Sequence, residues 1–241
     1  MPECSSGNQR FCPSKTTIGS QAPCGGLSQY CLADPTSTVK IPPKMELEAA
    51  APFMCAGVTA YAALKKISKY TTGGQAINVI GCGGIGYLAI KFACGMGYRV
   101  HAWDVEEAAI ELAKDSGAKR VSNPRTTPDS EIVKRSGTIV AAGNQEAYDL
   151  AFKATDLHGP IIAIGQPPEN ISIDVSKLIE RDFKLIATNQ GSKQELEEAF
   201  YLAAHYGIKP AYKTRQLHQI NEGFEQMEKG EVLGRLVYNM E

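Results

Sequence analysis

The feature that most constrains this chain is a glycine-rich segment at residues 81–86, which reads GCGGIG. It follows a short apolar run at 76–80 that is typical of a buried strand. From residue 85 to residue 93, apolar side chains recur at the spacing of an amphipathic helix. Residues 99–103 are typical of a second strand and are followed directly by Asp104. This order predicts a strand, a tight turn, a helix and a second strand of a parallel sheet.

Each residue type in this pattern suits a phosphate-binding turn. The first glycine allows the sharp exit from the strand, the second lets a pyrophosphate approach the backbone, and the third lets the helix pack closely on the strand. The start of the helix offers N–H groups to the phosphates, and Asp104 would accept hydrogen bonds from the adenosine ribose. The pattern favours dinucleotide binding over a purely structural turn. The residues expected to contact the cofactor here are Gly81, Gly83, Gly84, Ile85, Gly86 and Asp104.

The acidic residues after the second strand indicate which dinucleotide binds. Asp104, Glu106 and Glu107 lie close together, and no Lys or Arg occurs between them and Lys114. Three carboxylates would repel the 2′-phosphate of NADP(H), so the sequence favours NAD(H). The two glutamates also suit the start of a helix, which is compatible with this interpretation.

Composition and charge exclude several classes of protein. The chain has 241 residues, and its 25 Lys and Arg nearly balance its 26 Asp and Glu, so we expect neither a nucleic-acid partner nor an anionic membrane surface. No apolar run reaches the roughly 18 residues of a membrane span. The first residues lack the pattern of a secretory signal. We therefore expect a cytoplasmic protein whose seven cysteines are reduced thiols.

Alternating strands and helices from residue 73 onwards predict an α/β fold with a doubly wound parallel sheet. Ser192 and Glu195 form a capping box before one of the helices, and Gly207 follows its end. Outside the glycine-rich unit, the expected helices are 45–66 in two pieces divided near Pro52, 105–115, 147–155, 192–206 and 217–229. The expected strands are 26–33, 138–142, 161–164, 183–187 and 235–238.

Several motifs in one order resemble the medium-chain dehydrogenase/reductase superfamily, close to the zinc alcohol and cinnamyl alcohol dehydrogenases. The matching segments are GGLSQY at 25–30, MCAGVTAY at 54–61, GCGGIG at 81–86, and INE at 220–222 with GRLV at 234–237. The resemblance implies three parts. Residues 1–72 would be the remnant of a GroES-like catalytic domain with a linking helix, 73–191 an NAD-binding Rossmann domain, and 192–241 the helices and strand that return to the catalytic domain.

The resemblance also implies roles for residues outside the glycine-rich unit. Thr59 would face the nicotinamide, one turn beyond Cys55 on the same helix, and Gly165 would run along the nicotinamide through its backbone. Arg235 would reach the pyrophosphate. Cys55 matches one catalytic zinc ligand, but the motifs that supply the others in the family, Cys-x-x-Asp/Ser and Gly-His-Glu, would lie upstream, and no Gly-His-Glu occurs in this sequence. Cys55 and Thr59 are therefore the candidate catalytic residues of a zinc-free site.

The other cysteines leave one alternative open. Cys4 and Cys12 have the spacing of the last two ligands of the family's structural zinc lobe, and Cys24 and Cys31 lie nearby. Two interpretations of these cysteines are possible: a rearranged four-cysteine zinc site, or free thiols left from a lost site. The irregular spacing of the cysteines favours free thiols. We therefore expect no bound metal.

Three hypotheses about function follow from these interpretations. The first is an NAD(H)-dependent oxidoreductase that acts, without catalytic zinc, on a small alcohol, carbonyl or activated alkene. The second is a nucleotide-binding protein with lost or non-redox activity. The third is the N-terminally truncated product of an incomplete zinc alcohol dehydrogenase gene. The resemblance further implies a homodimer that pairs an edge strand at Lys184–Ala187.

Overall fold

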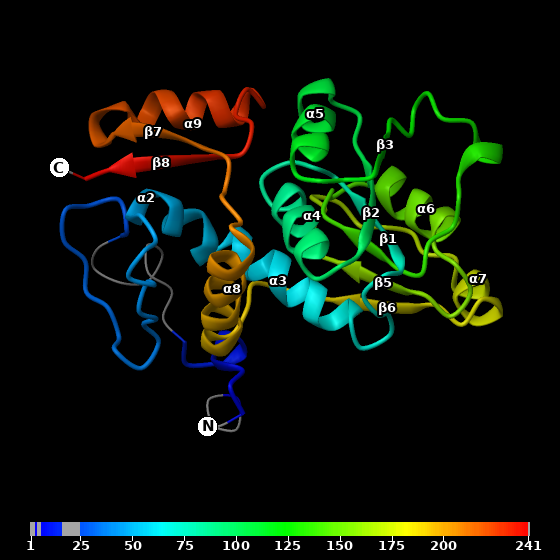
Figure 1. Ribbon diagram of the computed structural model, residues 1–241, viewed down its shortest axis with the longest axis horizontal. Coiled ribbons are helices and arrows are strands. Elements are labelled where there is room, and N and C mark those ends of the chain that lie inside the picture. Colours follow the sequence, from blue (N-terminus) through cyan, green and yellow to red (C-terminus); the bar gives the residue numbers. More distant parts are fainter. Residues whose placement is uncertain (1–2, 4–5, 16–24, 241) are drawn as a thin grey trace. The chain divides into compact units, whose positions relative to one another are not determined.

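Figure 1 shows the computed structural model of the protein, which describes residues 3, 6–15 and 25–240. Contacts between Cα atoms divide the chain into two units. We call Thr59–Asn189 the sheet unit, and Met1–Val58 together with Gln190–Glu241 the flanking unit. Each unit is described by itself below.

The sheet unit contains a six-stranded sheet in which every neighbouring pair of strands is parallel. Its spatial order is β3-β2-β1-β4-β5-β6, so the direction of winding reverses between β1 and β4. This is the doubly wound α/β arrangement that the sequence predicts, and its ligand-binding edge is the one where the strands end. The strands are β1 (Ala76–Ile80), β2 (Arg99–Trp103), β3 (Arg120–Ser122), β4 (Thr138–Val140), β5 (Pro160–Ala163) and β6 (Lys184–Ala187).

Helices cover both faces of this sheet (Figure 1). Helix α4 packs on β1 and β2, α5 packs on β2 and β3, and α6 packs on β1 and β4. The helices of this part are α3 (Ala56–Ile67), which starts just before the sheet unit, α4 (Gly86–Gly95), α5 (Glu107–Asp115), α6 (Gln145–Ala154) and α7 (Val175–Glu180), with a short 3₁₀ turn, η3, at Asp129–Glu131. The predicted strands and helices of this region are confirmed within a few residues, whereas β3 and α7 were not predicted.

A satisfied polar network lies inside the sheet. Asn78 on β1 accepts a hydrogen bond from the Trp103 indole at 3.1 Å and donates to the Ala154 carbonyl at 2.8 Å and to the Thr138 hydroxyl at 3.2 Å. Asn78, Trp103 and Thr138 are all fully buried. Because buried amide groups without partners are costly, these bonds help to fix the register of β1, β2 and β4.

The flanking unit contains a two-stranded parallel sheet, in which β7 pairs with β8 and α9 lies between them in the sequence. Its elements are η1 (Gln9–Phe11), α2 (Leu47–Ala50), η2 (Ala51–Met54), α8 (Lys193–Tyr206), β7 (Tyr212–Gln216), η4 (Leu217–Gln219), α9 (Ile220–Glu228) and β8 (Arg235–Asn239). Phe53 packs against Phe200, with ring centroids 5.8 Å apart. The helical region before the sheet unit is interrupted over residues 51–55, close to the predicted division at Pro52.

One predicted strand is wrong. Residues 26–33 form bends and irregular backbone, and Tyr30 and Leu32 are 87% and 76% exposed. The alternation of apolar residues in this segment is real, but no described strand pairs with it. An alternating pattern becomes a strand only where a neighbour satisfies its backbone N–H and C=O groups.

No single helix in the described ranges is long and apolar enough to cross a membrane. The segments Leu47–Met54 and Ala56–Ile67 pass that test only as a pair, which is bent by 52°. Most of the second segment is buried inside the protein, as in the core helix of many proteins.

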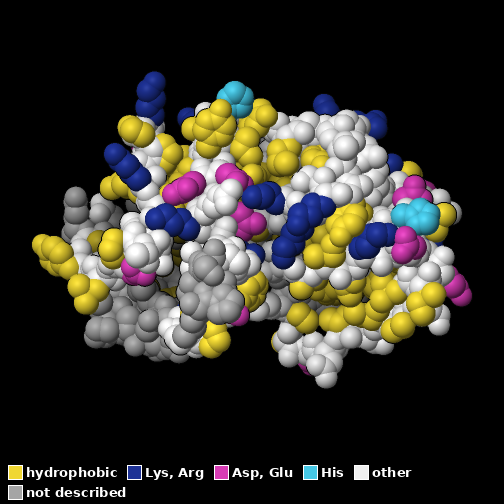
Figure 2. Space-filling model, turned by 90° about the horizontal axis from the view of Figure 1, so that it is seen from below, with side chains coloured by type: hydrophobic (Ala, Val, Ile, Leu, Met, Phe, Trp, Pro, Cys, Tyr) yellow, Lys and Arg dark blue, Asp and Glu magenta, His cyan; other side chains and the backbone are white. Residues whose placement is uncertain are grey.

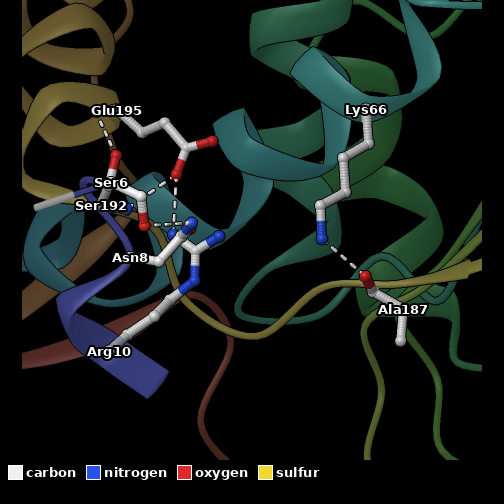
Figure 3. Close-up of polar contacts among 7 residues, drawn as sticks. All are labelled: Ser6, Asn8, Arg10, Lys66, Ala187, Ser192 and Glu195. Atoms are coloured by element: carbon white, nitrogen blue, oxygen red, sulfur yellow. Dashed lines mark hydrogen bonds and ion pairs between the residues drawn. The ribbon is translucent and has the colours of Figure 1, made fainter. Parts of the chain in front are cut away.

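The N-terminal segment is tied to the start of α8 by a half-buried ion pair (Figure 3). Ser192 and Glu195 form the predicted capping box, because the Glu195 carboxylate accepts from the Ser192 N–H at 2.7 Å and the Glu195 N–H donates to the Ser192 hydroxyl at 3.1 Å. The same carboxylate binds the Arg10 guanidinium at 3.0 Å. Gly207 ends the helix in the left-handed conformation, with φ of 63°, as predicted.

Electrostatics around Glu195 favour its charged form. Burial acts to raise the pKa of the Glu195 carboxyl, but the Ser192 N–H and the Arg10 guanidinium outweigh it and lower that pKa below 4.5. A carboxyl whose pKa is depressed by folding stabilises the folded state above its unfolded pKa, and it loses that contribution as the pH falls.

We predict that Glu195→Gln lowers the free energy of unfolding at pH 7 by about 1.5–3 kcal/mol, because it weakens charge-assisted hydrogen bonds to Arg10 and Ser192. The exposed Glu197→Gln is the matched control, and we expect it to change stability by less than about 0.5 kcal/mol. Urea unfolding followed by circular dichroism measures both. The difference between wild type and Glu195→Gln should shrink as the pH falls below about 4.5. An equal difference at pH 7 and pH 3 would contradict this account.

Candidate functional site

The glycine turn lies where β1 ends, and its first and last glycines are sterically required. Gly81 has a φ of +87°, and a Cβ there would lie 2.7 Å from the Ala142 nitrogen. A Cβ on Gly86, the first residue of α4, would overlap the Gly81 carbonyl oxygen. The close approach of α4 to the turn therefore depends on glycine at both positions.

The middle of the turn is open. A Cβ built on Gly83 would have no atom within 4 Å, so an outside group can approach this backbone closely. Gly84 follows in the turn, and Ile85 is the residue that precedes α4. No described side chain caps α4 at Ile85. At the start of α4 the Tyr87 N–H donates to the Gly83 carbonyl at 3.3 Å, so the neighbouring N–H groups of this turn are the candidates to receive an anion.

Asp104 is held by the glycine turn itself. One carboxylate oxygen accepts from the Cys82 N–H at 2.6 Å, and the other accepts from the Glu106 N–H at 3.0 Å. Each oxygen of a carboxylate has two acceptor positions, so both retain capacity for a ligand hydroxyl. The structure thus joins the predicted acidic residue after β2 to the predicted turn after β1.

The carboxyl ends of β4 and β5 complete this edge of the sheet. Gly165 packs against the residues that follow β4, since a Cβ on it would lie 2.5 Å from the Ala142 carbonyl carbon. Gly143 is equally constrained, because its Cβ would lie 2.5 Å from the Gln166 carbonyl oxygen. Gly81, Ala142 and Gly165 are therefore packed together. Ala142 and Gly143 were missed by the sequence analysis, although their position directly after a predicted parallel strand was the signal for them.

Cys82 lies inside the turn, but its chemistry is suppressed. Burial, together with the negative charge of Asp104, raises the pKa of the Cys82 thiol far above its usual range. The thiol therefore stays protonated at neutral pH and is not a nucleophile.

The remaining predicted site residues lie at four places. Thr59 is buried in the first turn of α3 and belongs to the sheet unit. Cys55 is exposed and belongs to the flanking unit, where it separates η2 from α3 and is not part of the predicted common helix. Arg235 begins β8 in the flanking unit, with its N–H donating to the Ala211 carbonyl at 3.0 Å. Gly165 follows β5 in the sheet unit.

The described residues do not fit a zinc site. Among residues 3, 6–15 and 25–240, no group of three or more His, Cys, Asp or Glu side chains is placed to hold a metal ion. Cys12 is buried, whereas Cys31 and Cys55 are exposed. Two members of the alternative four-cysteine site, Cys4 and Cys24, lie outside the described residues. Zinc sites in proteins need three or four ligands, so no described set supports one.

Comparison with known proteins places the chain in a family. The profile of the zinc-binding dehydrogenases matches residues 84–205. An alcohol dehydrogenase from Geobacillus stearothermophilus is 34% identical over 243 residues, which cover 99% of this chain and 71% of that protein. The chain belongs to the zinc-binding dehydrogenase family. The predicted resemblance to the zinc alcohol dehydrogenases is thereby confirmed, and the chain is an alcohol dehydrogenase-like oxidoreductase. It spans about 70% of the length of the two Geobacillus stearothermophilus alcohol dehydrogenases that it matches.

Solved structures of this family agree with the fold. Acetophenone reductase from Geotrichum candidum, in complex with NAD, superposes with a TM-score of 0.88 at 29% identity, covering 100% of this chain and 70% of that one. The alcohol dehydrogenase from Aeropyrum pernix gives a TM-score of 0.89 at 26% identity, covering 98% and 71%. Both matches include the sheet unit and the flanking unit.

We predict that Gly86→Ala destabilises the protein by at least about 3 kcal/mol, because the added Cβ overlaps the Gly81 carbonyl and the helix must move. Gly83→Ala is the matched control, since its Cβ meets no atom, and we expect a change below about 1 kcal/mol. Thermal unfolding followed by circular dichroism measures both. Equal destabilisation by the two substitutions would contradict the packing described here.

Proposed function

We propose that the protein is an NAD(H)-dependent oxidoreductase that acts on a small alcohol, carbonyl or activated alkene. The observation that carries this proposal is the 2.6 Å hydrogen bond from the Cys82 N–H to the Asp104 carboxylate, beside the open backbone of Gly83. This bond holds a carboxylate that would accept from ribose hydroxyls beside a turn that would bind phosphates. The NAD complex of the related acetophenone reductase supports the same cofactor.

Charge supports NAD(H) over NADP(H). Asp104 is followed by Glu106 and Glu107, and no Lys or Arg in the described ranges makes an ion pair with any of the three. A 2′-phosphate at this position would be repelled by these carboxylates and would displace ribose hydroxyls from Asp104.

When bound, NAD(H) would accept or supply the hydride. The glycine turn and the first N–H groups of α4 would bind its pyrophosphate, Asp104 would orient its adenosine ribose, and Gly165 would contact the nicotinamide side through its backbone. Arg235 would add a positive charge for the pyrophosphate. Thr59 and Cys55 are the residues we propose to position or polarise the substrate oxygen.

We propose that turnover does not depend on zinc bound through Cys55. The described residues contain no group of three His, Cys, Asp or Glu side chains that could hold a zinc ion. A carbonyl would then be activated by hydroxyl or thiol donors, and an alkene conjugated to a carbonyl needs less activation because conjugation spreads the charge. This favours substrates of the second kind.

A homodimer through β6 is part of the proposal. β6 is at the edge of the six-stranded sheet, and the Ala187 carbonyl at its end accepts from Lys66 at 2.6 Å (Figure 3). On the face in Figure 2, hydrophobic side chains gather where β6 and α7 lie. Val175 and Ile179 of α7 are 60% and 76% exposed. An edge strand beside exposed apolar side chains is typical of an interface.

We predict that wild-type protein binds NADH at least about tenfold more tightly than NADPH, and that Asp104→Asn removes most of this preference, because it deletes the charge that opposes a 2′-phosphate. Gly83→Ala should weaken both cofactors while leaving stability unchanged, since the methyl group occupies the approach of the pyrophosphate. Fluorescence titration with NADH and NADPH measures these affinities.

Gly26→Ala is the control for the last substitution, because its Cβ also meets no atom within 4 Å and Gly26 lies in the flanking unit. It should bind NADH like wild type. If Gly83→Ala and Gly26→Ala bind NADH equally well, the glycine turn is not the cofactor site.

We further predict that the purified protein contains far less than one zinc per chain, and that a chelator leaves NADH oxidation with enones or aldehydes unchanged. Thr59→Val should lower kcat by about tenfold or more if its hydroxyl positions the substrate. Elemental analysis and steady-state kinetics on a panel of aldehydes, ketones and enones provide the measurements. Stoichiometric zinc with chelator-sensitive turnover would overturn the zinc-free proposal, and NADH binding without turnover would favour a nucleotide-binding protein.

A further inference from the structure

A small pocket opens at the edge of the sheet where the strands begin, and its surface is almost wholly apolar. Its volume is about 170 Å³, and its lining includes Ala76, Val100 and four basic residues, Arg99, Lys119, Arg120 and Arg135. The glycine turn lies at the opposite edge, where the strands end. Five residues of a parallel strand span roughly 16 Å, so the pocket is separate from the candidate cofactor site.

The basic residues supply carbon chains to the pocket, and their charged ends lie around its mouth. Arg99, Lys119 and Arg120 are exposed, and Arg135 is half-buried. The Arg99 Nε atom donates to the Gly74 carbonyl at 3.2 Å, and Gly74 does not line the pocket. Long basic side chains often cover apolar surface with their carbon atoms while the charged end stays in water. The result is an apolar hollow with a positively charged rim.

The charges on this rim are not compensated. Within the described part of the chain, no Asp or Glu makes an ion pair with any of the four basic residues. Burial lowers the pKa of the Arg135 guanidinium, and the nearby charges of Arg120 and Arg99 lower it further. The whole chain has a net charge of −1, so this edge of the sheet carries a local excess of positive charge. Such an excess attracts and orients an acidic partner.

The topology of the sheet spreads these charges along the edge. Arg99 begins β2, Arg120 begins β3, and Arg135 lies shortly before β4. In the sheet order β3-β2-β1-β4, the outer two of these strands are three strand spacings apart, or roughly 14 Å. About four residues of an extended peptide cover that distance. One small anion therefore meets only part of the rim, whereas a peptide with several carboxylates can follow it.

We propose that this surface binds an acidic peptide segment of a partner protein, with one aliphatic side chain of the peptide in the pocket and its carboxylates on the rim. The pocket has the volume of about six water molecules at ~30 Å³ each, which is enough for a side chain such as leucine. The carboxylates on either side of that residue pair with the exposed basic ends. The site does not depend on the proposed cofactor.

The lining favours a peptide over a nucleic acid. Single-stranded nucleic acids bind to basic surfaces that also present aromatic side chains, on which the bases stack. The described residues that line this pocket include no Phe, Tyr or Trp, and the ring of His101 is 99% buried because the residue is only 1% exposed. The apolar pocket has no use for a phosphate backbone, but it suits an aliphatic side chain.

The test is a fluorescence anisotropy titration of the full chain with two labelled peptides at one ionic strength. One peptide is Asp-Glu-Asp-Leu-Asp-Glu-Asp, and the other has serine in place of leucine. The leucine peptide should bind at least about tenfold more tightly, because only its side chain gains from burial in the pocket. Equal affinities of wild type for the two peptides would show attraction between charges alone and would overturn the proposal.

Two variants test the rim. Arg120→Met removes one charge from the rim and keeps most of the carbon chain, so it should weaken the leucine peptide at least about threefold. Lys229→Met is the matched control, since it removes the same charge from an exposed residue of the flanking unit that does not line the pocket. It should change the affinity by less than about 1.5-fold. Equal weakening by the two substitutions would contradict the proposed site.

A third variant tests the pocket with every charge in place. Ala76 is half-buried at the start of β1, and Ala76→Leu should fill the pocket with a side chain that suits a strand. It should abolish the preference for the leucine peptide and leave the affinity for the serine peptide unchanged. Thermal unfolding checks that the variant folds, and the Arg120→Met comparison stands without it. Tighter binding of a single-stranded oligonucleotide of equal charge than of the leucine peptide would overturn the proposal in favour of a nucleic acid.

Discussion

The close packing of α4 against the turn after β1 is the constraint on which the candidate cofactor site depends. Gly86 lies so near the Gly81 carbonyl that no side chain fits between them, and Gly81 itself has a backbone conformation that favours glycine. This contact fixes where α4 begins relative to the turn, beyond the end of β1. It also sets the position of the Cys82 N–H, which holds Asp104. One steric contact therefore determines both halves of the site.

The glycine turn after β1 is also packed against the segments that follow β4 and β5, the next two strands of the sheet. Ala142, which follows β4, packs directly against Gly81. Gly165, which follows β5, packs against Ala142 in turn. Deeper in the sheet, Asn78 links β1 to β2, β4 and the end of α6 through three hydrogen bonds. A polar residue in the middle of the central strand is tolerated because every one of these bonds is made. Together, the two sets of contacts fix the order and register of the strands that carry the turn.

The sequence predicts most of the sheet unit, because its long elements are marked locally. Apolar runs, a glycine turn and helical periodicity identify β1, α4 and β2 without knowledge of the fold. β3 is missed because Arg120, Val121 and Ser122 are too few and too polar to stand out, and β3 exists only because β2 offers it a neighbour. The converse error at residues 26–33 has the same cause, since an alternating segment without a partner strand stays irregular. Pairing is a tertiary property that a local pattern does not contain.

The distribution of charge follows from the topology in a similar way. The net charge of −1 suggests an even surface, yet the two edges of the sheet differ in sign. Where the strands end, Asp104 and the two glutamates that follow it make the edge acidic around the turn. Where they begin, Arg99, Arg120 and Arg135 gather without a described acidic partner. These arginines are scattered along the sequence, and the parallel pairing of β1 with β2 and β4, and of β2 with β3, brings the starting ends of these strands to one edge of the sheet.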